Sequence, residues 1–209
     1  DYIKKYTEDA ELNIVSGFFT ISALALLKQF EKEPQKFRFV LIEIAGKADD
    51  KEGPTKTIDI LHSLNENSTL TSAFHLQDIA QQAIEVLKQD NVEVKRINNT
   101  FCHAKTYVYY DKKDDRNCYF VTGSSNFTEK GLGIKDSSNV ELNVAKTGRD
   151  EDFIEMLKWF EDIWRNSAAD KISIVGEDGK ATKIAVKEYF IRCIEHFCKE
   201  YSPKDIYYK

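Results

Sequence analysis

The opening of the chain restricts its fold more than any other stretch, because it alternates a strand, a helix and a strand with short joints. Residues 12–20 (LNIVSGFFT) are rich in β-branched and aromatic side chains, which predicts a strand. Ser22 is placed to cap a following helix with an apolar face, and residues 37–45 (FRFVLIEIA) predict a second strand. A strand–helix–strand unit of this kind makes a right-handed crossover, so the two strands are expected to run parallel.

The rest of the chain continues with helical and strand patterns after a polar, irregular stretch at residues 46–68. The predicted elements are an amphipathic helix at 72–89, a short strand at 91–97, a hairpin of strands at 101–110 and 117–122, a strand at 139–145, and helices at 150–164 and 182–201. In the strand at 139–145, Val140, Leu142 and Val144 share one face. This order predicts an α/β fold with a mixed sheet and a helical C-terminal part.

The length of 209 residues, at 24.1 kDa, suits one substantial domain and not two. We expect its core over about residues 10–166 and a strand and helix extension over residues 167–209. Because the chain opens with Asp1 and not with Met, we expect it to be part of a longer protein. No apolar run approaches the roughly 20 residues of a membrane span and no basic-then-apolar leader is present, so a cytoplasmic protein without a membrane partner is expected.

The charge is distributed unevenly along the chain. A net charge of -5 excludes a protein that coats nucleic acid with a wholly basic surface. Residues 91–135 nevertheless carry eight basic against five acidic side chains, which fits an anion-binding face or, as the favoured alternative, a solvated hairpin surface. The four cysteines include no C-x-x-C pair, which indicates buried, reduced thiols and not a zinc or redox site.

The most informative chemistry lies in the first strand of the predicted hairpin, FCHAKTYVYY. Alternate side chains of a strand share a face, so His103 and Lys105 are expected to point the same way, about 7 Å apart. A titratable ring nitrogen beside a fixed positive charge suits an anionic phosphate. An isolated H-x-K pattern is nevertheless most often structural, and the pair needs a second observation to carry a function.

The end of the return strand supplies that observation. Gly123 permits a sharp turn with close backbone approach, and Ser124 and Asn126 offer neutral hydrogen-bond donors. Asn126 is followed three positions later by Glu129, which resembles the N-cap signature of a helix whose first amides hold a phosphate oxygen. The candidate phosphate-binding residues are therefore Gly123, Ser124 and Ser125, although a simple capped turn would explain these residues alone.

The combined pattern, H-x-K on one strand and G-S-x-N at the end of its partner, resembles the phospholipase D superfamily, in particular its single-motif, nuclease-type members. The resemblance implies a phospholipase D-like α-β-α sandwich and identifies the motif residues as His103, Lys105, Ser124 and Asn126. The family often has an Asn-x-Glu strand afterwards, and NVELN supplies Glu141. One departure is that the family's aspartate, five positions after the lysine, is Tyr110 here.

The resemblance also implies a mechanism and a set of catalytic residues. His103 would attack phosphorus to give a phosphohistidine, while Lys105, Asn126 and Ser124 would stabilise charge on the phosphate oxygens and Glu141 would hold His103. A second histidine must protonate the leaving alcohol, and none of the other three histidines lies in an H-x-K context. The chain is therefore expected to supply half a site and to form a homodimer, with no cofactor and no metal.

The substrate implied by the resemblance is DNA, since single-motif members without a lipid-seeking amphipathic segment are more often nucleases. The tail KEYSPKDIYYK resembles the joint at which such domains meet a superfamily 2 helicase domain in bacterial restriction-like or repair-like proteins. A downstream helicase domain is thus an expected partner. Two alternatives stay open: a non-catalytic module for DNA binding or dimerisation, and a phosphodiesterase that acts on phospholipid.

Overall fold

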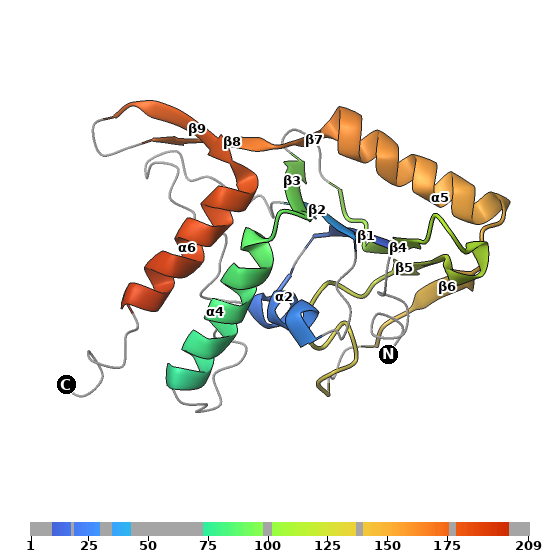
Figure 1. Cartoon of the computed structure of the whole chain (residues 1–209), viewed down its shortest axis with the longest axis horizontal. Helices are drawn as coiled ribbons and strands as arrows, with labels where there is room; N and C mark the ends of the chain where they lie inside the picture. Colours follow the sequence, from blue (N-terminus) through green and yellow to red (C-terminus); the bar gives the residue numbers. More distant parts are fainter. Residues whose placement is uncertain are drawn as a thin grey trace.

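A mixed β-sheet lies between two helical layers in the computed structural model, which describes residues 10–17, 19–29, 35–42, 73–97, 102–136, 140–175 and 179–200 (Figure 1). One face of the sheet is covered by α2 (Ile21–Leu26), α4 (Ala73–Lys88) and α6 (Val186–Glu200), and the other face by α5 (Glu151–Asp162). The α/β fold class with a phospholipase D-like α-β-α arrangement is therefore confirmed.

Seven strands pair in the main sheet within the described part of the chain, in the spatial order β6, β5, β4, β1, β2, β3, β7. Their bounds are β1 (Glu11–Ser16), β2 (Lys36–Ile42), β3 (Val92–Ile97), β4 (Thr106–Tyr110), β5 (Tyr119–Gly123), β6 (Asn143–Thr147) and β7 (Ala168–Ala169). Strands β1, β2 and β3 are parallel, and β4, β5, β6 and β7 each run antiparallel to their neighbours. The sheet is therefore mixed, as predicted.

The strand–helix–strand opening is confirmed by the parallel pairing of β1 with β2. The helix between them differs in its cap: the Oγ1 of Thr20, not Ser22, accepts the amide of Ala23 at 3.3 Å. Thr20 has the extended backbone that an N-cap requires, whereas Ser22 already lies inside α2, where its hydroxyl donates to Glu129 at 2.8 Å and lies 3.1 Å from the Thr20 hydroxyl. The polar stretch predicted at 46–68 lies outside the described residues.

The core is divided by the sheet into two unequal parts. The larger part fills the space between the sheet and α2, α4 and α6, with Phe37, Phe39 and Tyr109 fully buried in it. On the opposite face, α5 places Phe153 and Phe160 against the sheet, as the spacing of its aromatic residues predicts. The alternation of strand residues between these two parts determines on which side each site residue lies.

A buried arginine joins the sheet to α5. Arg38 of β2 is 6% exposed; its Nε donates to Oδ1 of Asn13 at 2.7 Å, and its Nη2 pairs with Glu161 at 2.6 Å. A second carboxylate, Glu11, lies 3.5 Å away, and the guanidinium stacks over the Phe160 ring at 4.8 Å. This charge is enclosed by partners from β1, β2 and α5, so it couples the packing of three elements.

The C-terminal part packs against the same domain. A separate hairpin of β8 (Lys171–Val175) and β9 (Ala181–Ala185) precedes α6, so the helix predicted at 182–201 begins later, at Val186, because the preceding five residues pair as β9. Phe190 and Ile194 of α6 are buried in the larger part of the core. Within the described residues, no helix has the length and apolar character that crossing a membrane requires.

Candidate active site

The two H-x-K side chains come together at the edge of the sheet where β4 begins. The segment from Cys102 to Lys105 is extended but precedes the paired strand, so the strand predicted at 101–110 is shorter and starts at Thr106. The Nζ of Lys105 lies 2.8 Å from the Nε2 of His103 and donates to the His103 carbonyl at 3.1 Å. The prediction that these side chains share a face is therefore met.

The two side chains in this contact differ in their exposure to solvent. His103 is exposed, whereas Lys105 is 5% exposed. Burial lowers the pKa of Lys105 below its ordinary value, and the nearby Glu141 and Cys102 partly oppose this shift. The geometry thus places an exposed imidazole, whose Nε2 contacts Nζ, beside a largely buried lysine.

The end of β5 approaches the strand β6 so closely that only glycine fits at position 123. A Cβ there would lie 2.2 Å from the carbonyl oxygen of Leu142, and the amide of Gly123 donates to the Lys105 carbonyl at 3.1 Å. The next residue, Ser124, donates its amide to Leu142 O at 3.0 Å and accepts the Leu142 amide at 2.9 Å. Gly123 therefore brings three segments, from β4, β5 and β6, to one point.

Glu141 contacts Ser124 at this point. The Ser124 hydroxyl donates to the Oε2 of Glu141, and the carboxylate is close enough to Lys105 to raise its pKa. The sequence predicted Glu141 as the residue that holds His103, whereas the side-chain partner found here is Ser124. Both motif segments and Glu141 are thus gathered in one place, and the orientation of His103 by Glu141 stays a prediction.

Ser125 stabilises the turn after β5 through hydrogen bonds. It is buried, its amide donates to Asn143 Oδ1 at 3.3 Å, and its hydroxyl accepts from Asn143 Nδ2 at 2.7 Å. The phenol of Tyr107 donates to the Ser125 carbonyl at 3.0 Å, and burial raises the pKa of Tyr107, which keeps this donor protonated. The role of Ser125 in phosphate binding stays a prediction, while Asn143 and Tyr107 are supporting residues that the motif alone did not identify.

Asn126 does not begin a helix, contrary to the prediction. The chain from Thr128 onward forms consecutive turns, and it is the hydroxyl of Thr128 that accepts the Gly131 amide at 2.9 Å. The predicted partner Glu129 instead pairs with Lys135 at 2.9 Å. The Oδ1 of Asn126 lies 3.9 Å from the position that a Cβ on Gly17 would occupy, so Asn126 extends beside the end of β1.

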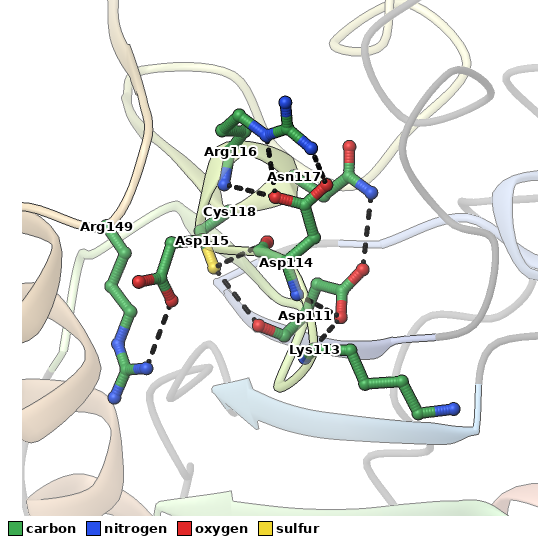
Figure 2. Close-up of polar contacts among 8 residues, drawn as sticks. All are labelled: Asp111, Lys113, Asp114, Asp115, Arg116, Asn117, Cys118 and Arg149. Carbon is green, nitrogen blue, oxygen red and sulfur yellow. Dashed lines mark hydrogen bonds and ion pairs between the residues drawn. The ribbon is translucent and has the colours of Figure 1, made fainter.

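The far end of the hairpin is held by Asp111 (Figure 2). This buried carboxylate accepts the amides of Lys113 at 2.7 Å and Asp114 at 3.1 Å, and the Asn117 side-chain amide at 3.3 Å. The Cys118 thiol donates to the Asp111 carbonyl at 3.4 Å. Asp111 therefore has a local, turn-forming role, which the run of Asp and Lys residues could have indicated.

Three of the eight basic side chains at residues 91–135, Lys112, Arg116 and Lys135, form ion pairs with carboxylates. Lys112 pairs with Glu11 at 2.5 Å and Arg116 with Asp114 at 3.0 Å, both at the turn opposite to Gly123. These contacts fit a solvated hairpin surface better than one continuous anion-binding face. Within the described ranges, no three His, Cys, Asp or Glu side chains gather in a way that could hold a metal ion.

Three solvent-exposed apolar side chains lie in or just before β6, the edge strand next to the site. Val140, Leu142 and Val144, which are predicted to share one face, have exposed fractions of 98%, 78% and 61%. The strand begins later than predicted, at Asn143, and Val144 pairs with Thr122 of β5, which places Val144 on the α5 side of the sheet. We call these three residues the β6 row.

Comparison with known protein families identifies the chain. A family model described as "Cardiolipin synthase, PLD-like domain" matches residues 50–164, which is more than half of the chain and includes both motif segments and Glu141. No curated protein matches the sequence. A phospholipase D-like domain is of the phosphodiesterase type, which agrees with a histidine and a lysine side by side at the sheet edge. The chain therefore belongs to the phospholipase D-like domain family.

Proposed function

We propose that this domain is a metal-independent DNA endonuclease that acts through a phosphohistidine intermediate in a homodimeric site. One observation carries the proposal: the Nε2 of His103 lies 2.8 Å from the Nζ of Lys105, at the point where Ser124 and Glu141 meet. A nucleophile, a cation and hydroxyl and amide donors beside each other are what attack on a phosphodiester requires.

The Lys105 contact prepares His103 for nucleophilic attack. In this proposal the Nζ of Lys105 donates to Nε2, and an incoming phosphate oxygen can replace Nε2 as the partner of that ammonium. Nε2 then attacks phosphorus: the P–N bond forms, the bond to the leaving oxygen breaks, and that oxygen takes a proton from a second histidine. Water activated by the second histidine then cleaves the P–N bond and restores His103.

The second histidine is assigned to a second copy of the chain. His62, His75 and His196 lie outside any H-x-K pattern, so one copy carries half of a two-histidine site. The β6 row supports this assignment, because its three exposed apolar side chains lie in or just before β6, which is an edge strand of the sheet that the described residues form, and two of them are the neighbours of Glu141 in the chain. Exposed apolar edge strands are surfaces that pair with another chain.

DNA is proposed as the substrate on the nuclease-type spacing of H-x-K and G-S-x-N and on the likeness of the tail to a joint with a helicase domain. In this proposal a helicase domain follows in the longer protein, and it delivers DNA to the site. The family description favours a second candidate, since it names cardiolipin synthase, an enzyme of a phospholipid. Both substrates present the same phosphodiester to His103 and Lys105.

The proposal is tested by incubating the protein with labelled single- and double-stranded DNA and with vesicles of phosphatidylglycerol, each in excess chelator. We expect DNA cleavage that the chelator does not reduce, because the nucleophile and the charge-stabilising groups are protein side chains. Release of glycerol from the vesicles without DNA cleavage would replace the nuclease by the lipid phosphodiesterase. Loss of all cleavage in chelator would contradict the phosphohistidine mechanism.

The homodimer is tested by replacing Leu142 of the β6 row with lysine. A charge on an exposed edge strand opposes pairing with a second chain, so Leu142→Lys is expected to be monomeric in sedimentation velocity and to lose DNA cleavage. Ile154→Lys, at another exposed apolar position on α5, is the matched control and should stay dimeric and active. Full activity of a monomeric Leu142→Lys protein would show that one copy holds the complete site.

A further inference from the structure

A groove opens on the α5 side of the sheet, between α5 and the hairpin of β4 and β5. Its volume is about 470 Å³, within the roughly 300–1,000 Å³ of small-molecule sites. Met156 and Trp159 line it from α5, and Phe120 lines it from β5. The H-x-K and G-S-x-N side chains do not line this groove, and the mechanism proposed above does not use it.

One end of the groove reaches the candidate active site. Ala104 lines the groove and lies between His103 and Lys105 in an extended segment, so alternation directs it to the opposite side from the two motif side chains. The hydroxyl of Thr122 lies in the groove and donates to the carbonyl of Lys105 at 3.3 Å. The groove and the two motif side chains therefore lie on opposite sides of one extended segment. A group attached to a phosphate at His103 can reach the groove by passing the end of that segment.

The lining suits a flat, uncharged ring that carries hydrogen-bond donors. Trp159 is 36% exposed, so part of its indole is accessible for stacking. The hydroxyls of Thr106 and Thr122 lie 3.0 Å apart on the sheet side of the groove. The carboxylate of Glu155 can accept hydrogen bonds from amino groups, whereas that of Asp152 already pairs with Lys146. None of the described lining residues is basic, which disfavours a phosphate inside the groove.

We infer that this groove binds a nucleobase of the substrate next to the scissile phosphate, an inference that rests on the proposed nuclease function. Each site binds the part of the nucleotide that suits its charge. The anionic phosphate binds at Lys105, and the base, with its amino groups, binds in the acidic groove and stacks on Trp159. Stacking on one aromatic side chain changes affinity by about 5- to 150-fold per base. Trp159 is thus a substrate-positioning residue.

Binding is measured by tryptophan fluorescence with nucleosides, which carry no phosphate. The chain has two tryptophans, so the difference between the wild type and Trp159→Phe isolates the indole in the groove, and Trp164→Phe leaves it as the remaining fluorophore. We expect deoxyguanosine or deoxycytidine to quench Trp159 saturably and inorganic phosphate to leave it unchanged. Quenching by tetramethylammonium without quenching by nucleosides would overturn the inference in favour of a site for organic cations.

Cleavage kinetics give a second measurement. Trp159→Ala is expected to raise KM for DNA about tenfold or more with little change in kcat, and to leave cleavage of an abasic oligonucleotide unchanged. If Trp159→Ala changed the cleavage of DNA and of the abasic oligonucleotide equally, its effect would come from a disturbed fold, and the inference would be overturned. The nucleoside titration does not depend on cleavage, so failure of the nuclease proposal and failure of the base site are distinguished: the first abolishes turnover, and the second abolishes quenching.

Discussion

Replacing His103 with alanine is expected to abolish DNA cleavage while DNA binding is retained. The variant removes the Nε2 that forms the P–N bond, whereas Lys105 and Ser124 stay in place to hold the phosphate. Loss of a nucleophile in a group that acts as a unit reduces turnover by on the order of 10⁴- to 10⁶-fold. Cleavage and electrophoretic binding of the same labelled oligonucleotide, both in excess chelator, measure the two effects separately.

The matched control is His75→Ala, a histidine of α4 outside the H-x-K pattern, which should cleave DNA like the wild type. Mixed dimers test the second histidine: when the wild type and His103→Ala exchange subunits in equal amounts, about a quarter of the dimers keep both histidines and remain active. Activity equal to half that of the same total amount of wild type would contradict a shared site, because it would mean that each wild-type subunit is active by itself. A wild type that binds DNA but matches His103→Ala in lacking cleavage would identify the domain as a binding module.

Removing the buried arginine is expected to produce the largest change in stability. Arg38→Ala leaves the carboxylates of Glu161 and Glu11 and the amide of Asn13 without the cation that they surround. Breaking a buried ion pair on one side costs about 3–5 kcal/mol in the free energy of unfolding, or roughly 6–20 °C in Tm for a chain of this size. Urea denaturation and thermal melting followed by circular dichroism measure the loss.

Two comparisons identify the cause of that loss. Arg192→Ala breaks an exposed pair with Glu188 and should cost less than about 1 kcal/mol. Arg38→Met/Glu161→Met removes both charges and should be more stable than Arg38→Met alone, because no Glu161 remains with only the exposed Arg165 as its partner. An Arg38→Ala protein as stable as Arg192→Ala would show that the network around Arg38 contributes little.

The same network predicts how stability responds to acid. Burial acts to raise the pKa of Glu161, but the hydrogen bond and charge of Arg38 outweigh it and hold the pKa below the ordinary 4.5. A carboxyl whose pKa is lowered by folding stabilises the native state above its unfolded pKa. Its contribution is therefore complete above about pH 4.5 and is lost as the pH falls through the native value, which explains why Arg38→Ala should be least harmful in acid.

Local patterns in the sequence were sufficient for most of the fold. The crossover at the start, the hairpin that carries the motifs and the aromatic helix α5 each follow from periodicity and turn residues over short stretches. The grouping of His103 with Lys105 was predictable for the same reason, since side chains two apart on an extended segment share a face whatever surrounds them. The requirement for glycine at position 123 follows from the motif that contains it.

Contacts between distant segments were decided only by the tertiary structure. The partner of Glu141 is Ser124 because β5 and β6 pair in one particular register, and a register is set by the whole sheet. Thr20 caps α2 in place of Ser22 because the end of β1 determines where the backbone stops being extended.

The solvent exposure of a side chain, finally, depends on which elements pack against it. Alternation predicts that Val140, Leu142 and Val144 share a face, and all three side chains are exposed. Whether that face is covered depends on the elements that lie against it, and in this fold the β6 row remains uncovered while Phe153 and Phe160 of α5 are buried. The sequence by itself thus determined the elements and the motif residues, through local periodicity and spacing. The tertiary structure decided their partners, their burial and the groove beside them, because these depend on how distant segments pack.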